Sequence, residues 1–218
     1  MDFTFDVALS FCIVIPVIIG LVRFSKINKS YYPFIYCICL GLINEIISLC
    51  LVVNGYYNTV NYNIYMLLES ILLLWQFKNW GLFQRYKFVF PVMVTILTSV
   101  WILENFIIFK ITRYSSYFQI TYSFMISLMS INIINKLIVT ERKMLVKNSI
   151  FILCVSFVMF YTFSVLSESF WIYGVDGNKD LSENIQTISI LTNFIAILLY
   201  TVAILWMPSK QKFSLPSS

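Results

Sequence analysis

Long apolar stretches alternate with short polar ones along the whole chain. A transmembrane helix requires about 20 mostly apolar residues. Seven segments meet this requirement, near residues 5–22, 33–53, 62–80, 88–109, 115–137, 148–172 and 184–206. The gaps between them are short, so helices that follow one another in sequence should also be neighbours in space. The pattern predicts an all-α protein whose residues 1–218 form one domain, a bundle of seven transmembrane helices.

Proline and glycine positions agree with these boundaries. Pro33 stands at the start of the second segment, where a helix tolerates proline. Gly55, Gly81 and Gly174 follow the ends of three segments, where a left-handed cap favours glycine. Pro16 lies inside the first segment and predicts a kink there.

Composition supports a membrane location. Of the 218 residues, 60% are hydrophobic and 11% are charged, whereas a soluble domain carries about 25% charged residues. The polar gaps are too short to hold a soluble domain. Any function must therefore belong to the bundle itself or to a partner docked on it.

Lys and Arg residues predict the orientation, since they gather in cytoplasmic loops. Three of the fifteen, Lys110, Arg113 and Lys179, fall on one side of the predicted membrane. The other twelve fall on the opposite side: Arg23, Lys26, Lys29, Lys78, Arg85, Lys87, Lys136, Arg142, Lys143, Lys147, Lys210 and Lys212. The N-terminus is therefore expected outside and the C-terminus in the cytoplasm. This rule also explains the basic loops without a nucleic-acid partner.

Two glutamates lie deep in the second and third segments. Glu45 and Glu69 are each twelve residues from Tyr57, which lies in the polar turn between the segments. A helical hairpin would place both carboxyl groups at the same depth. A charge at this depth costs roughly 2.5–3.5 kcal/mol on insertion scales, so intramembrane carboxylates tend to be functional.

Further polar residues extend this candidate site. Glu104 and Glu168 lie near the outer ends of the fourth and sixth segments, although snorkelling to the interface would also explain them. No Lys or Arg lies in the apolar core, and unpaired buried carboxylates tend to share protons or bind cations. The predicted ligand-binding residues are Glu45, Glu69, Asn44, Tyr65, Asn193, Glu168 and Glu104. A stripe of small polar residues on the fifth segment is typical of helix packing: Ser116, Gln119, Ser123, Ser127 and Ser130.

Several catalytic and cofactor classes are excluded. The chain has no histidine, no lysine in its apolar core for a retinal Schiff base, and no aspartate there for an intramembrane protease. Nucleotide-binding and metalloprotease motifs are also absent. The five cysteines fall within apolar segments without a Cys-x-x-Cys pattern and are interpreted as packing residues. We therefore expect no enzymatic activity, no cofactor and no metal site.

The pair Asn44-Glu45 and the segment from Tyr62 to Glu69 resemble a group of small uncharacterised bacterial seven-helix proteins. That resemblance implies a multi-pass protein of the bacterial inner membrane. The outside-to-inside topology resembles that of seven-helix receptors, without their Asp-Arg-Tyr and Asn-Pro-x-x-Tyr motifs. Seven helices also allow a three-plus-one-plus-three transporter of the SWEET or PnuC type.

Three functions remain open at this stage. The first is a sensory or ligand-binding membrane protein, with an outward acidic pocket for a proton, a cation or a small cationic solute and a signalling partner on the basic side. The second is a small-solute or cation transporter, which needs a polar path through the inner half as well. Gln76, Asn132 and Asn135 are the residues available for such a path. The third is a membrane scaffold or assembly subunit.

Overall fold

The computed structural model describes residues 7, 9–84, 86–140, 145–173 and 179–209. These residues are almost entirely helical and form no β-strand, apart from an isolated bridge between Ile27 and Ser209. The prediction of an all-α protein is confirmed. Gly174 and several of the basic loop residues lie outside the described ranges.

Within the described ranges, seven α-helices have defined bounds, and each overlaps one apolar segment of the sequence. They are α2 (Val14–Arg23), α3 (Tyr32–Val53), α4 (Thr59–Asn79), α5 (Val89–Ile102), α6 (Ser116–Thr140), α7 (Ser149–Tyr173) and α8 (Lys179–Trp206). A 3-10 turn, η1 (Phe11–Ile13), leads into α2, and a π-helix, η3 (Leu103–Ile108), continues α5. Two further 3-10 turns precede α3 and α7: η2 (Lys29–Tyr31) and η4 (Leu145–Lys147).

Five helical stretches among the described residues are long and apolar enough to cross a membrane. They are Lys29–Val53, Val89–Ile108, Ser116–Thr140, Ser149–Ile172 and Leu181–Trp206, and Phe11–Arg23 is a shorter apolar helix. The remaining helix, α4, has 21 residues but is more polar. Its polar side chains, including Asn63, Glu69 and Gln76, are buried inside the bundle.

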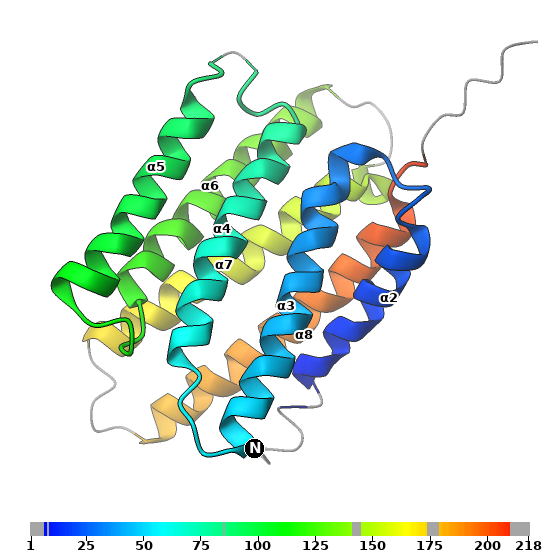
Figure 1. Cartoon of the computed structure of the whole chain (residues 1–218). Coiled ribbons are helices and arrows are strands. Elements are labelled where there is room, and N and C mark those ends of the chain that lie inside the picture. Colours follow the sequence, from blue (N-terminus) through cyan, green and yellow to red (C-terminus); the bar gives the residue numbers. More distant parts are fainter. Residues whose placement is uncertain (1–6, 8, 85, 141–144, 174–178, 210–218) are drawn as a thin grey trace, which may run out of the picture.

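Six of the helices form a ring in sequence order. Helix α2 packs on α3, α3 on α4, and α4 on α6. Helix α6 then packs on α7, α7 on α8, and α8 on α2, which closes the ring. Helix α5 stands outside the ring against α4 and α6 (Figure 1). Any space enclosed by the ring is therefore bounded by helices other than α5.

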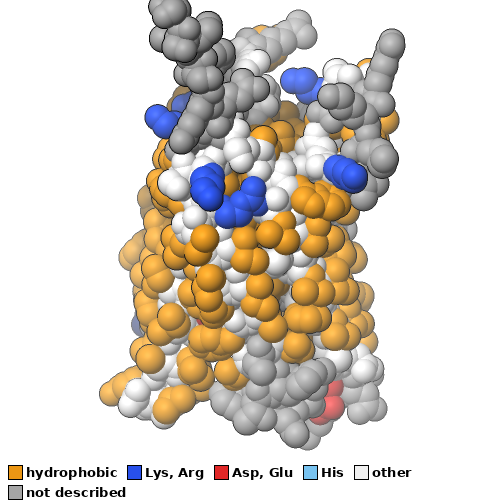
Figure 2. All heavy atoms as spheres, turned by 90° about the vertical axis from the view of Figure 1, so that its right-hand side faces the viewer, with side chains coloured by type: hydrophobic (Ala, Val, Ile, Leu, Met, Phe, Trp, Pro, Cys, Tyr) orange, Lys and Arg blue, Asp and Glu red, His pale blue; other side chains and the backbone are white. Residues whose placement is uncertain are grey.

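The two ends of the bundle differ in charge. Consecutive helices run in opposite directions, so Arg23, Lys29, Lys78 and Lys147 all lie at one end, here called the basic end. Figure 2 shows Lys and Arg side chains gathered near that end, above a broad belt of hydrophobic side chains. The opposite end, which carries the turn at Tyr57, is called the Tyr57 end.

Glycine ends two of the helices as the sequence predicts. Gly55 and Gly81 have φ angles of 77° and 83°, in the left-handed region. After α3, the Gly55 amide donates to the Val52 carbonyl at 3.0 Å and the Tyr56 amide donates to the Leu51 carbonyl at 2.9 Å. This pair of bonds is the Schellman motif, which satisfies carbonyls that a helix end otherwise leaves open.

The predicted kink at Pro16 has a local counterpart. Proline has no amide hydrogen to bond the carbonyl four residues earlier, and its ring crowds that carbonyl. For Pro16 that residue is Cys12, which lies in the 3-10 turn η1 rather than in regular α-helix.

One arginine joins the first and last helices of the ring. The Arg23 guanidinium, at the end of α2, donates to the carbonyl oxygens of Ile204 and Leu205, and to that of Met207 at 3.2 Å. These carbonyls belong to the last turn of α8 and the residue that follows it, where no intrahelical donor is available. A cation there is also favoured by the helix dipole.

Candidate functional site

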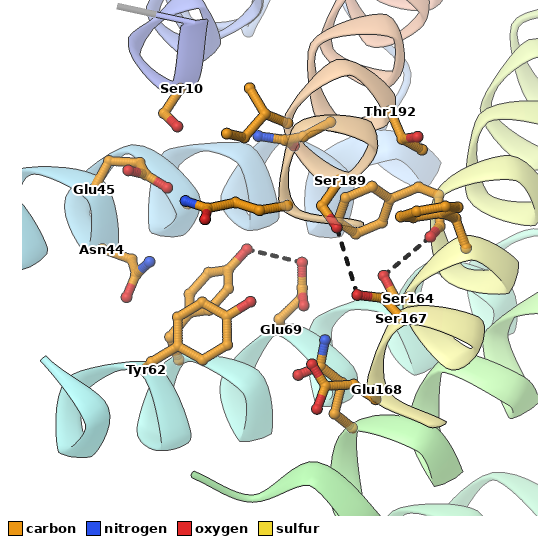
Figure 3. Close-up of a pocket in the computed structure, with 18 of the residues that line it drawn as sticks. Ser10, Asn44, Glu45, Tyr62, Glu69, Ser164, Ser167, Glu168, Ser189 and Thr192 are labelled. Carbon is orange, nitrogen blue, oxygen red and sulfur yellow. Dashed lines mark hydrogen bonds between the residues drawn. The ribbon is translucent and has the colours of Figure 1, made fainter. Parts of the chain in front are cut away.

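The ring of helices encloses a cavity of about 360 Å³. We call it the acidic cavity, because its lining includes Glu45, Glu69 and Glu168 but no Lys or Arg. Figure 3 shows these three carboxylates around a common space, with side chains from α3, α4, α7 and α8. Its residues extend from Ser10 and Trp171, near the Tyr57 end, to Ile197 and Glu69 midway along their helices.

Glu69 is the most enclosed of the three cavity carboxylates. Its side chain is 7% exposed. The Tyr65 hydroxyl, one turn earlier on α4, donates to Oε1 at 2.8 Å, and the Tyr122 hydroxyl of α6 donates to Oε2 at 3.0 Å. Two phenol donors from different helices therefore fix the carboxylate in the cavity wall.

Glu45 lines the same cavity but is less buried than Glu69. Its side chain, on α3, is half-buried and has no hydrogen-bond partner among the described residues. The preceding Asn44 is buried, and its side-chain oxygen accepts from the Asn61 amide at 2.8 Å, which links α3 to α4. Asn44 is thus held in place, whereas the Glu45 carboxylate is left available to a ligand.

Glu168 lines the cavity from α7 and is 8% exposed. The Ser167 hydroxyl beside it lies 3.5 Å from the Ser189 hydroxyl of α8. Asn193, also on α8, lines the cavity one turn further from the Tyr57 end. The structure therefore brings together six of the seven predicted residues: Asn44, Glu45, Tyr65, Glu69, Glu168 and Asn193.

Glu104 is the exception, because it is not part of the cavity lining. It lies in the π-helix η3 and is 3% exposed. Its Oε1 accepts from the Tyr117 backbone amide at 3.1 Å and its Oε2 from the Phe118 amide at 2.6 Å. These amides belong to the first turn of α6, so Glu104 caps that helix and interacts favourably with its dipole.

Tyrosine rings form one wall of the cavity. Tyr62 lies with its ring centroid 5.8 Å from that of Tyr65 and 5.4 Å from that of Tyr114, on which it stacks. Burial raises the pKa of Tyr114, which lies in the loop before α6, so its hydroxyl stays protonated. That hydroxyl donates to the Gln119 side chain. The wall presents aromatic faces and hydroxyl oxygens together.

Sequence reasoning missed two contributors to this wall. Tyr114 and Tyr122 both line the cavity, and neither is among the residues predicted from the sequence. Tyr122 lies three residues after Gln119 and therefore shares its helix face, so this spacing was the available signal. The Ser stripe of α6, in contrast, mostly packs against neighbouring helices. Ser123 and Ser130 are fully buried away from the cavity lining, and Ser127 lies 3.4 Å from the Thr162 hydroxyl of α7.

An aromatic cluster lies between the cavity and the basic end. The ring of Phe157 lies at its centre, with the centroids of five other rings within 6.5 Å. The cluster consists of Phe34, Phe77, Trp80, Phe157, Tyr161 and Tyr200. Phe34 lies near the start of α3 and Phe77 near the end of α4, so the cluster belongs to the basic half of the bundle.

The three residues available for a polar path, Gln76, Asn132 and Asn135, lie apart from the acidic cavity. Gln76 is fully buried, but its oxygen accepts from the Phe34 amide at 2.9 Å and its amide donates to the Ser30 carbonyl at 2.7 Å. It therefore caps the start of α3. Asn132 and Asn135 are both exposed on α6, and neither lines the acidic cavity.

Within the part of the chain that the structure describes, no group of three or more His, Cys, Asp or Glu residues could hold a metal ion. Among the residues that the structure describes, no Lys or Arg forms an ion pair with a cavity carboxylate. The arrangement can instead supply negative charge, hydroxyl groups and aromatic faces to an organic ligand.

Comparison with known proteins adds no relative. No protein-family description, no curated protein and no solved structure matches the chain.

Proposed function

We propose that the chain crosses a bacterial inner membrane seven times, with the N-terminus outside and the C-terminus in the cytoplasm. Five long apolar helices and the shorter apolar helix support six of these spans. Helix α4 supplies the seventh, since its 21 residues extend about 31 Å at 1.5 Å per residue. Its polar side chains Asn63, Glu69 and Gln76 are buried inside the bundle. The basic end faces the cytoplasm under the positive-inside rule.

In this orientation the acidic cavity lies in the outer half of the membrane. We infer that it binds a small organic cation, such as a quaternary ammonium ion, and that the protein acts as a sensor or ligand-binding protein. The observation that carries this inference is the lining, which combines three carboxylates with tyrosine faces and, among the residues that the structure describes, contains no Lys or Arg. Cations are attracted both by carboxylates and by the faces of aromatic rings.

Cavity size favours an organic cation over a bare metal ion. A volume of about 360 Å³ lies at the lower end of the range for small-molecule pockets. Calcium would require six to eight oxygen ligands close together, whereas two of the Glu69 interactions are already made by tyrosine hydroxyls.

The aromatic cluster favours binding over transport. Alternating access requires the site to open toward both sides in turn. Phe157 and the five rings around it pack the basic half, and Gln76 is engaged as a cap. Transport of the same cation remains the second candidate, and a scaffold role with carboxylates at a partner interface is the third. Cation flux into liposomes loaded with a fluorescent reporter would distinguish transport from binding.

Thermal unfolding in lipid nanodiscs tests the binding proposal. Tetramethylammonium and choline should raise the unfolding temperature, because a ligand at a hundred times its Kd stabilises by about 2.7 kcal/mol. Na⁺ at the same ionic strength serves as the salt control. Glu45→Gln and Glu69→Gln should each abolish the stabilisation, because each removes a carboxylate from the cavity.

Glu183→Gln is the matched control for these variants. It removes the same charge from an exposed position of α8 outside the cavity, and the ammonium response should remain. If neither ammonium ion stabilises the protein, or if the cavity variants respond like the control, the acidic cavity is not a cation site.

A further inference from the structure

A second cavity, of about 340 Å³, is lined by residues of α7 and by one residue of α8. We call it the α7–α8 groove. Its lining contains no charged residue and consists of Val158, Met159, Thr162, Phe163, Leu166 and Thr192. Leu166 is 52% exposed, in keeping with a surface that faces the hydrocarbon of the bilayer.

The groove adjoins the acidic cavity. Phe163 of α7 and Thr192 of α8 line both spaces, and the other four groove residues line the groove alone. In Figure 3, Thr192 lies at the edge of the side chains that surround the acidic cavity. The two spaces therefore meet at these two side chains, between α7 and α8.

We propose that the ligand is a cationic amphiphile with a single hydrocarbon chain. Its ammonium head occupies the acidic cavity, and its chain passes Phe163 and lies in the α7–α8 groove. This inference rests on the proposed function, because it assigns the head to the same carboxylates. It adds a route of entry, since such a ligand reaches the site sideways from the bilayer.

Charge explains why this occupant is favoured over an ordinary phospholipid. A phospholipid head carries a phosphate, which Glu45, Glu69 and Glu168 would repel at close range. A head that carries only positive charge is attracted by the same three groups. The apolar lining of the groove suits a chain that already lies in hydrocarbon.

The test compares tetramethylammonium with decyltrimethylammonium in phosphatidylcholine nanodiscs, with Kd expressed on free aqueous concentration. The decyl compound should bind more tightly by roughly fourfold for each methylene that enters the groove. Met159→Trp and Leu166→Trp fill the groove without altering the acidic cavity. Each should weaken decyltrimethylammonium by roughly tenfold or more and leave tetramethylammonium within about twofold.

Leu198→Trp is the matched control, because Leu198 is an exposed apolar residue of α8 that lines neither space. Protein-free nanodiscs measure how much of the decyl compound the bilayer itself absorbs. If tetramethylammonium binds but the decyl chain adds nothing, or if the groove variants match Leu198→Trp, the lateral site is overturned and the small-cation site stands. If neither compound binds, both proposals fail.

Discussion

The half of the bundle toward the Tyr57 end and the half toward the basic end are built from the same helices but packed differently. Toward the Tyr57 end, α3, α4, α7 and α8 enclose a cavity with three carboxylates. Toward the basic end, the same helices close around Phe157 and the five rings near it. Polar side chains occur in both halves, so polarity alone does not mark a binding site.

Gln76 and Glu45 show what separates the two halves. Gln76 is fully buried, and both ends of its amide are bonded to the backbone near the start of α3. Glu45 is half-buried and has no hydrogen-bond partner within the described ranges. A satisfied polar group serves the fold, whereas an unsatisfied group beside a cavity is available to a ligand.

The largest expected effect concerns the basic half, where the aromatic cluster lies. Phe157→Ala removes the central ring of the aromatic cluster, at a site 1% exposed. It should lower the free energy of unfolding by about 3–5 kcal/mol, since the cavity left behind cannot be refilled. Reversible unfolding in mixed micelles measures this. Phe170→Ala, at a half-exposed position of the same helix, should change it little. Equal effects would show that the cluster is not the packed half of the bundle.

A smaller effect is expected at the cap of α6. Glu104→Ala leaves the Tyr117 and Phe118 amides without their acceptor. The free energy of unfolding should fall by about 0.5–2 kcal/mol, the usual range for a lost helix cap. Tetramethylammonium affinity, measured by the same thermal assay, should stay constant. A large loss of affinity would place Glu104 in the binding site after all.

The smallest effect concerns the hydrogen bond between Tyr122 of α6 and Glu69 of α4, in the wall of the acidic cavity. A double-mutant cycle with Tyr122→Phe and Glu69→Gln isolates the 3.0 Å hydrogen bond between them. The coupling energy should be about 0.6–1.7 kcal/mol, as for other hydrogen bonds between membrane helices. Zero coupling would indicate that the Tyr122 phenol and the Glu69 carboxylate act independently.

Much of the fold follows from the hydropathy pattern. Every predicted segment overlaps a helix in the described part of the chain, because long apolar runs and glycine caps act locally and do not depend on tertiary contacts. Six of the seven candidate site residues share one cavity, since intramembrane carboxylates are costly and few in this chain. Whether they bind a ligand stays a prediction.

Other features depend on contacts that periodicity does not encode. Glu104 looks like another intramembrane carboxylate, yet the π-helix turns it toward the first turn of α6. Helix α5 is more apolar than its neighbours α4 and α6, but this composition does not say which helices it packs against. Tyr122 enters the cavity because α6 packs against α4, a pairing between helices that are not consecutive.

The bond that closes the ring has a consequence for the order of biosynthesis. Arg23 and its first acceptor, Ile204, are separated by 181 positions along the chain. During synthesis, α2 therefore enters the bilayer long before the carbonyls that its arginine will bind have been made. The acidic cavity, which takes residues from α8, is likewise incomplete until that helix arrives. The site and the closure of the bundle are thus the last parts of the protein to form, and a chain that stops before α8 has neither.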